Sequence, residues 1–280
     1  MVIPVEAKSV SIMGVDYAVL HIPSGGDLYL TNFGLSFRTH LHPENWYEPQ
    51  WFVQRRIPLE GTSAIYKVPT KPVDGATLDL VARFNRVGQE VPLPSSVLNE
   101  NPQAEFNSPF EEFALVMELR NSGSGGSGRV FTKRPLAIYA PSKRLQEWQT
   151  GRLTSKVAAK QTKHPQGILD MCREYIVLYG WIKGLNAVQV ARSFLMSGSA
   201  AETFLKEATL LAIGDLQRRG FRVLDIKPEH VIMRMCHDGS LFRRRDGNPA
   251  YALVDYELLE RIDVPSNNAV SDKRNDLCAV

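Results

Sequence analysis

Hydrophobic and polar positions alternate through much of the first half of the chain, which is the pattern of half-buried strands. Segments 17–22 and 28–33 flank Ser24-Gly-Gly-Asp27, whose glycines permit the positive φ of a tight hairpin. Further strand-like runs occupy 52–57, 64–68, 78–84, 135–140 and 175–179. These segments predict a sheet, to which residues 1–50 contribute an N-terminal strand extension.

Two segments carry the start signals of helices. Ser108 is followed by a proline and, three positions on, by Glu111, so a helix is predicted over 108–120. Ser199-Ala-Ala-Glu202 predicts a second capping box. The helix after it has one apolar stripe, made of Leu205, Ala208, Ala212 and Leu216.

Two polar stretches are predicted to lie outside the core. Segment 142–166 predicts a helical insertion, in which Arg152, Lys156 and Lys160 recur every fourth residue and would share one face. That face has two interpretations, a binding site for an anionic substrate or nucleic acid and, more commonly, a solvated surface. Segment 121–128 is composed almost wholly of glycine and serine, which predicts a flexible loop without chemistry.

The composition is that of a globular chain and excludes few functions. With 280 residues, 44% of them hydrophobic, the chain can bury a sizeable core. Its 33 basic and 30 acidic residues leave a net charge of +3, too small to indicate nucleic-acid binding. Three widely spaced cysteines predict neither a disulfide framework nor a zinc site, which favours a cytoplasmic protein. No membrane span or secretion signal is expected.

Two acidic motifs carry the candidate chemistry. The first is Asp225-Ile-Lys-Pro-Glu-His230, and the second, Val254-Asp255-Tyr256-Glu257, places its aspartate thirty residues after Asp225. Phosphoryl transfer needs one carboxylate that orients the acceptor hydroxyl and a second that binds Mg²⁺ with one more ligand. The order of the motifs assigns the first role to Asp225 and the second to Asp255.

The two motifs resemble the catalytic and metal loops of the protein-kinase-like superfamily, Asp-Leu-Lys-Pro-Glu-Asn and Asp-Phe-Gly. The resemblance implies that Lys227 meets phosphate charge and that His230 binds metal beside Asp255. Histidine in the asparagine position is similar to lipopolysaccharide-core sugar kinases, and Asp-Tyr-Glu is similar to aminoglycoside and choline kinases. The chain looks like a divergent, bacterial-type member, in which Val223-Leu224 replaces the His-Arg pair of protein kinases.

The resemblance also implies two nucleotide-binding segments upstream. Gly61, Thr62 and Ser63 are small enough to form a loop that covers phosphates, although an ordinary hairpin turn is the commoner use of such residues. Trp181 lies in Gly180-Trp-Ile-Lys-Gly184, where the family has its adenine-binding hinge.

Arg83 stands where the family places the lysine that grips the α- and β-phosphates. Arginine binds phosphate through a planar fork and does not replace lysine without consequence. Glu111 or, preferably, Glu112 of segment 108–120 would be its partner, because Glu111 is committed to the capping box.

The resemblance implies an α+β, two-lobed protein-kinase-like fold. Residues 51–180 would form a sheet-rich N-lobe, and residues 181–280 a minimal helical C-lobe with the catalytic and metal loops. Only twenty-five residues follow Asp255, too few for the substrate platform of protein kinases, so either the large lobe is minimal or the chain is a fragment, and a small acceptor is expected.

The implied function is an ATP- and Mg²⁺-dependent phosphotransferase acting on a hydroxyl of a small-molecule or sugar-like acceptor. A pseudokinase that binds nucleotide or scaffolds a protein partner is the alternative, because the usual lysine and asparagine are missing. Nucleotidyl transfer from the same site is a third possibility.

Overall fold

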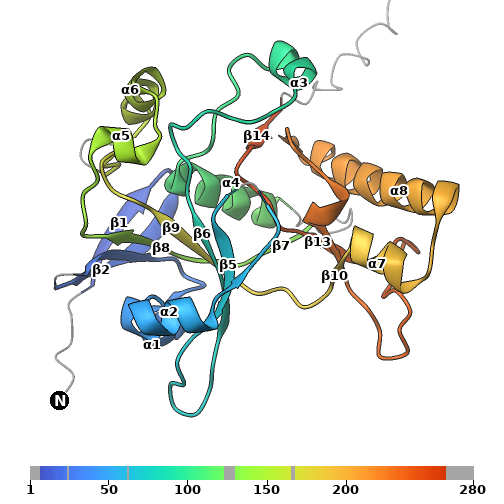
Figure 1. The fold of residues 1–280 in the computed structure, drawn as a ribbon, viewed down its shortest axis with the longest axis horizontal. Coiled ribbons are helices and arrows are strands. Elements are labelled where there is room, and N and C mark those ends of the chain that lie inside the picture. The colour runs from blue at the N-terminus through green and yellow to red at the C-terminus, as the bar shows by residue number, and fades with distance from the viewer. Residues whose placement is uncertain (1–6, 24, 62, 123–129, 165–167, 263–280) are drawn as a thin grey trace, which may run out of the picture.

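An eight-stranded antiparallel sheet in the order β1-β2-β3-β8-β9-β6-β5-β4 is the largest element of this mixed α/β structure (Figure 1). The computed structural model describes residues 7–23, 25–61, 63–122, 130–164 and 168–262. The strands of the sheet are β1 Lys8–Ile12, β2 Val15–Ile22, β3 Gly26–Leu30, β4 Ile57–Pro58, β5 Ile65–Pro69, β6 Asp79–Phe84, β8 Pro135–Pro141 and β9 Ile176–Gly180. Thr62 and most of the glycine-serine segment 121–128 lie outside the described residues.

The β2–β3 hairpin confirms the strand prediction near the N-terminus. β3 also pairs with β8, so the N-terminal strands extend the same sheet. Gly26 has a φ of +111°, and a Cβ there would clash with the carbonyl oxygen of Ala140. Glycine is therefore required at this position by both the turn and the neighbouring strand.

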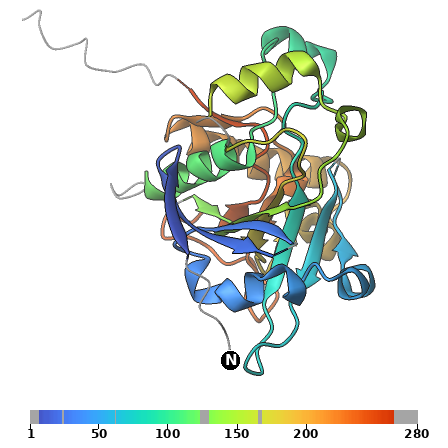
Figure 2. The ribbon, with the colours of Figure 1, turned by 90° about the vertical axis from the view of Figure 1, so that its left-hand side faces the viewer.

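Helices cover both faces of the sheet (Figure 2). α1 Arg38–Leu41 and α2 Pro49–Arg55 lie on one face, where Phe52 is buried in a core with Leu80 and Leu178. α4 Pro109–Asn121 lies on the other face and buries Phe110, Phe113 and Val116 in the main core. The face that α4 covers is the one to which Arg83 contributes its side chain.

The predicted strand over 52–57 is wrong, because most of this segment is helical. The Glu48 carboxylate caps α2 by accepting hydrogen bonds from the backbone N–H groups of Gln50 and Trp51, and Pro49 occupies the first position. Only Ile57 and Pro58 remain as strand β4, which pairs with β5. A local cap outweighed the strand preference of the residues that follow it.

Of the two predicted capping boxes, one is present. Ser108 Oγ accepts from the Glu111 N–H at 3.1 Å, and a Glu111 carboxylate oxygen accepts from the Ser108 N–H at 2.7 Å. The capping box predicted at Ser199 is absent, because Ser199 already lies inside α8 Gly198–Gln217. The actual N-cap, Ser197, makes no side-chain cap bond.

The polar insertion forms two short helices, α5 Glu147–Thr150 and α6 Thr154–Thr162. Arg152 lies between them and donates to the carbonyls of Val87 and Arg173, each at 3.0 Å. Lys160 is 2% exposed and pairs with Glu105 and Glu111. The predicted basic face is therefore wrong, since these side chains fold inward onto carbonyl and carboxylate oxygens.

The second half of the chain places α7 Ala187–Ser193 and α8 on the side of the molecule away from β1 and β2 (Figure 1). Beside them lie a four-stranded sheet, β10-β12-β13-β7, and the β11–β14 pair. The bounds are β7 Phe131–Thr132, β10 Leu185–Asn186, β11 Phe221–Val223, β12 Val231–Met233, β13 Tyr251–Leu253 and β14 Leu259–Arg261, with α3 Ser95–Glu100 after β6.

The thirty residues between the two aspartates contain turn signals at 237–240 and 246–249, which predict an inserted strand pair, and the structure has two isolated bridges there, Met235 with Leu241 and Arg243 with Pro249. Arg244, in the run Arg243-Arg-Arg245 of this insertion, is held to α8 by Asp215 at 2.8 Å, so its side chain has a structural contact. No helix in the described part of the chain combines the length and apolarity that crossing a membrane requires.

Candidate functional site

The two acidic motifs lie side by side although thirty residues separate them. β11, which precedes Asp225, pairs with β14, which follows Asp255. The backbone N–H of Leu224 also donates to the carbonyl of Leu258 at 3.3 Å. Asp225 and Asp255 consequently line one cavity of about 20 Å³, together with Arg86 and Glu257.

Each aspartate lies within ion-pair distance of a basic residue of the first motif. Lys227 Nζ lies 2.9 Å from Asp225 Oδ2, and His230 Nε2 lies 3.6 Å from Asp255 Oδ2. His230 ends the short helical turn η3, Pro228–His230, which directs its ring toward the second motif. The side chains of Asp225 and Asp255 are 29% and 32% exposed, so both carboxylates remain accessible to solvent.

Arg83 contacts Glu112, which is the pairing that the sequence favoured over Glu111. Its second terminal nitrogen contacts Glu257 without hydrogen-bond geometry, and Arg86 donates to the other Glu257 oxygen at 2.6 Å. Tyr179 on β9 donates to the remaining Glu112 oxygen at 2.5 Å. Both glutamates are buried and fully used within this group, which we call the Arg83 cluster: Arg83, Arg86, Glu112, Tyr179 and Glu257.

Opposing effects set the pKa values in the Arg83 cluster. Burial alone would lower the pKa of Arg83, but the charges of Glu112 and Asp255 outweigh it and raise that pKa. Burial and the charge of Arg83 lower the pKa of Arg86, which remains protonated at neutral pH. Both arginines of the cluster are therefore charged at neutral pH.

Lys133 is a buried cation beside Tyr179 of the Arg83 cluster, and the sequence did not single it out. It lies between β7 and β8, is 5% exposed, and has its backbone N–H bonded to the Tyr256 hydroxyl at 2.8 Å. Burial and the nearby Arg83 lower the pKa of its ammonium to about 8. Because Lys133 and the exposed Arg134 are adjacent cations, nothing in the local sequence indicates which of them enters the core.

The remaining nucleotide-binding candidates lie apart from the acidic loops. Gly61 and Ser63 are in the β4–β5 connection, at the end of the sheet where Ile65 pairs with Arg83, and they do not line the cavity at Asp225. Trp181 follows β9, donates its backbone N–H to the Asp79 carbonyl at 3.1 Å, and has Lys67 Nζ 4.9 Å from its ring. Trp181 and Arg83 thus flank opposite ends of β6.

The donor groups fit Mg²⁺ only in part. Asp255 offers the carboxylate oxygen that Mg²⁺ prefers, whereas the imidazole of His230 is a ligand more typical of transition metals. The His230 Nδ1 atom is buried without a hydrogen-bond partner. Within the described ranges no group of three His, Cys, Asp or Glu side chains gathers as a metal site. A Mg²⁺ ion at Asp255 would therefore depend on phosphate and water oxygens for its other ligands.

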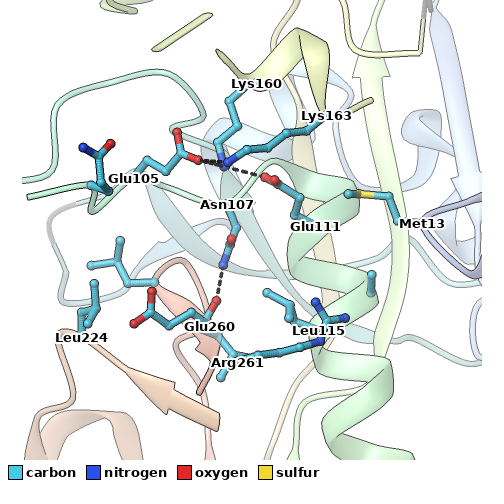
Figure 3. Close-up of a pocket in the computed structure, with 14 residues that line it drawn as sticks. Met13, Glu105, Asn107, Glu111, Leu115, Lys160, Lys163, Leu224, Glu260 and Arg261 are labelled. Atoms are coloured by element: carbon cyan, nitrogen blue, oxygen red, sulfur yellow. Dashed lines mark hydrogen bonds and ion pairs between the residues drawn. The ribbon is translucent and has the colours of Figure 1, made fainter. Parts of the chain in front are cut away.

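A larger cavity of about 370 Å³ opens beside the acidic loops, between α4, α6 and β14 (Figure 3). Leu258 lines both cavities. The volume of this larger cavity is in the range of small-molecule pockets. Its lining cations are already paired: Lys160 contacts Glu105 at 3.0 Å and Glu111 at 2.7 Å.

His40, His42 and Glu44 are close in sequence and could suggest a metal site, but they do not gather as one in the described part of the chain. His42 Nδ1 lies 3.6 Å from Glu44, while His40 Nε2 lies 3.2 Å from the Ala76 carbonyl oxygen. The pair of histidines is accounted for by these local contacts.

No protein-family model and no curated protein sequence matches the chain. Among solved structures, it is similar to the crystal structure of the BubR1 kinase domain, with a TM-score of 0.41 and 8% sequence identity. The match covers 88% of this chain and 51% of that one, so the chain spans about half the length of that structure. A likeness at this level says nothing about substrates.

Proposed function

We propose that the chain is a protein-kinase-like, ATP- and Mg²⁺-dependent phosphotransferase whose acceptor is a hydroxyl group of a small molecule or sugar-like compound. The observation that carries the proposal is that two motifs far apart in sequence place Asp225 and Asp255 on one cavity. The Arg83–Glu112 contact beside them supports it, because kinases need this type of ion pair in place.

In this proposal each residue has a defined task. Asp225 orients the acceptor hydroxyl and accepts its proton, and Lys227 offsets charge on the transferred group. Asp255 and His230 hold the metal. Arg83, held by Glu112, orders the region around the phosphates, the loop with Gly61 and Ser63 covers them, and Trp181 meets adenine. Bound ATP with Mg²⁺ supplies the transferable phosphoryl group. The sheet with α4 is then the N-lobe, and the α7–α8 region the C-lobe.

The test is nucleotide-dependent stabilisation followed by turnover. ATP with Mg²⁺ should raise the Tm, since a ligand bound only by the folded state stabilises it. ADP production should follow when sugars and amino alcohols are supplied. Asp225→Ala should retain the Tm rise and lose about 10²- to 10⁴-fold in turnover. Asp238→Ala, in an exposed turn, is the control. If ATP leaves the Tm unchanged, the proposal is wrong.

A pseudokinase is the second candidate, and two specific observations favour it. Both terminal nitrogens of Arg83 are taken by buried glutamates, and the cavity at Asp225 has room for little more than a water molecule. A scaffold of this kind would bind nucleotide or a protein partner without turnover. A Tm rise with ATP, no ADP production with any acceptor and no effect of Asp225→Ala would select this candidate.

A further inference from the structure

Lys133 differs from every other cation near the acidic loops in having no anionic partner. Arg83, Arg86 and Lys227 each contact a carboxylate. Among the described residues, the Lys133 ammonium makes neither a hydrogen bond nor an ion pair, and its closest charge-related contact is the ring of Tyr179 at 5.8 Å. The Lys133 residue is 5% exposed, and the charges of Asp255 and Glu112 act on its ammonium without a direct contact.

The fold holds Lys133 in this position. Its backbone N–H is bonded to Tyr256, the residue directly after Asp255, and Thr132 before it belongs to strand β7, which pairs with β13. The segment is thus anchored to the strand that leads into the metal motif. The charges of Arg83, Asp255 and Glu112 all act on the Lys133 ammonium, which places it among these groups.

An unpaired buried ammonium is costly, so its retention is explained best by an anion that arrives with a ligand. The Arg83 cluster has no carboxylate left for it, because the two Glu112 oxygens bind Arg83 and Tyr179 and the two Glu257 oxygens contact Arg83 and Arg86. Asp255 lies opposite His230. Asp255 and Glu112 act on the Lys133 ammonium without contacting it, so a ligand oxygen can supply the direct partner that it lacks.

We propose that Lys133 is the phosphate-binding lysine of the site and that it takes over the role for which Arg83 is unavailable. The inference rests on the proposed nucleotide binding and names a residue for it. Arg83 then organises α4 through Glu112, and Lys133 contacts a phosphate group of the bound nucleotide. The separation of these two tasks accounts for the arginine on β6, since a paired arginine needs no access to ligand.

The test compares ATP, ADP and adenosine by isothermal titration calorimetry with Mg²⁺ present. Lys133→Met keeps the length and apolar body of the side chain and removes the charge. It should weaken ATP and ADP binding about tenfold to hundredfold, the usual worth of a charged hydrogen bond, and leave adenosine binding unchanged. Arg134→Met, an exposed cation one residue away, is the matched control and should bind all three as the wild type does.

Thermal unfolding separates a ligand-binding role from a structural one. Because Lys133 has no partner to lose, Lys133→Met should keep or raise the Tm of the ligand-free protein. A lowered Tm with equal weakening of ATP and adenosine would mean that Lys133 only shapes the site, and would overturn the inference. Lys133→Gln provides a second uncharged variant if the methionine variant does not fold.

The outcomes also separate this inference from the function it rests on. If the wild type binds ATP and Lys133→Met binds it equally well, the inference alone is wrong. If the wild type binds none of the three compounds, nucleotide binding itself is wrong and Lys133 loses its proposed ligand.

Discussion

The molecule contains two pairs of carboxylates that lie close together and behave differently. Glu112 and Glu257 are buried and fully occupied by arginine and tyrosine donors, whereas the Asp225 and Asp255 side chains are 29% and 32% exposed and each lies within ion-pair distance of a basic residue of the first motif. The buried pair is fixed by its partners. The oxygens of the exposed pair are accessible and incompletely coordinated, as the proposed function requires.

Substitutions in the buried pair should therefore lower the stability of the fold, whereas substitutions in the exposed pair should affect chemistry under the proposed function. Removing one member of a buried ion network leaves an uncompensated charge in a low-dielectric environment. Removing an exposed carboxylate costs little folding free energy, since water solvates the group that remains.

The largest expected effect on stability is at Glu112. Glu112→Ala leaves Arg83 with Glu257 alone and deprives Tyr179 of its acceptor, so the free energy of unfolding should fall by about 3–5 kcal/mol. Urea denaturation measures it. The control on the same helix is Glu118→Ala, which breaks an exposed pair with Arg261 and should cost at most about 1 kcal/mol. Equal losses in the two variants would remove the distinction drawn for the buried pair.

A smaller effect is expected in the pH dependence of stability. The pKa of Lys133 is lowered from 10.5 to about 8 in the folded protein. Between these values the unfolded chain binds a proton that the folded chain does not, so stability rises with pH in this window, by up to about 1.4 kcal/mol per unit. Below pH 8 the full cost of the buried charge is present.

Denaturation at a series of pH values from 7 to 10 checks this rise, with pH in steps of about half a unit. Lys133→Met should lack the contribution, and Lys143→Met, which removes an exposed lysine, should retain it. A slope that is the same in the wild type and in Lys133→Met would show that the ammonium is not buried in the way described.

The smallest effect on stability is expected at Asp225. Asp225→Asn removes a partly exposed pair with Lys227 and should change the free energy of unfolding by less than about 1 kcal/mol. The same variant should lose ATP turnover under the proposed function. A large loss of stability would place Asp225 with the buried carboxylates and contradict the comparison.

Local patterns were sufficient for much of the fold. Strands β2 and β3, the capping box at Ser108 and the strand that carries Arg83 are present where the sequence placed them. Each depends on neighbours a few residues away, which is the range over which caps, turns and side-chain periodicity act. The strand predicted after Glu48 is wrong because the Glu48 cap, which is also a local signal, starts a helix there.

The amino-acid sequence was enough to single out Asp225, His230 and Asp255 as candidates for phosphate chemistry, because they stand in recognisable motifs, and to select Glu112 as the partner of Arg83. Three features became visible only in the folded chain: Glu257 joins Arg83, Lys160 and Arg152 turn inward, and Lys133 is buried without a contacting anion. These outcomes depend on which distant strands pair and on how charges are compensated once water is excluded, and neither is encoded within a short window of sequence.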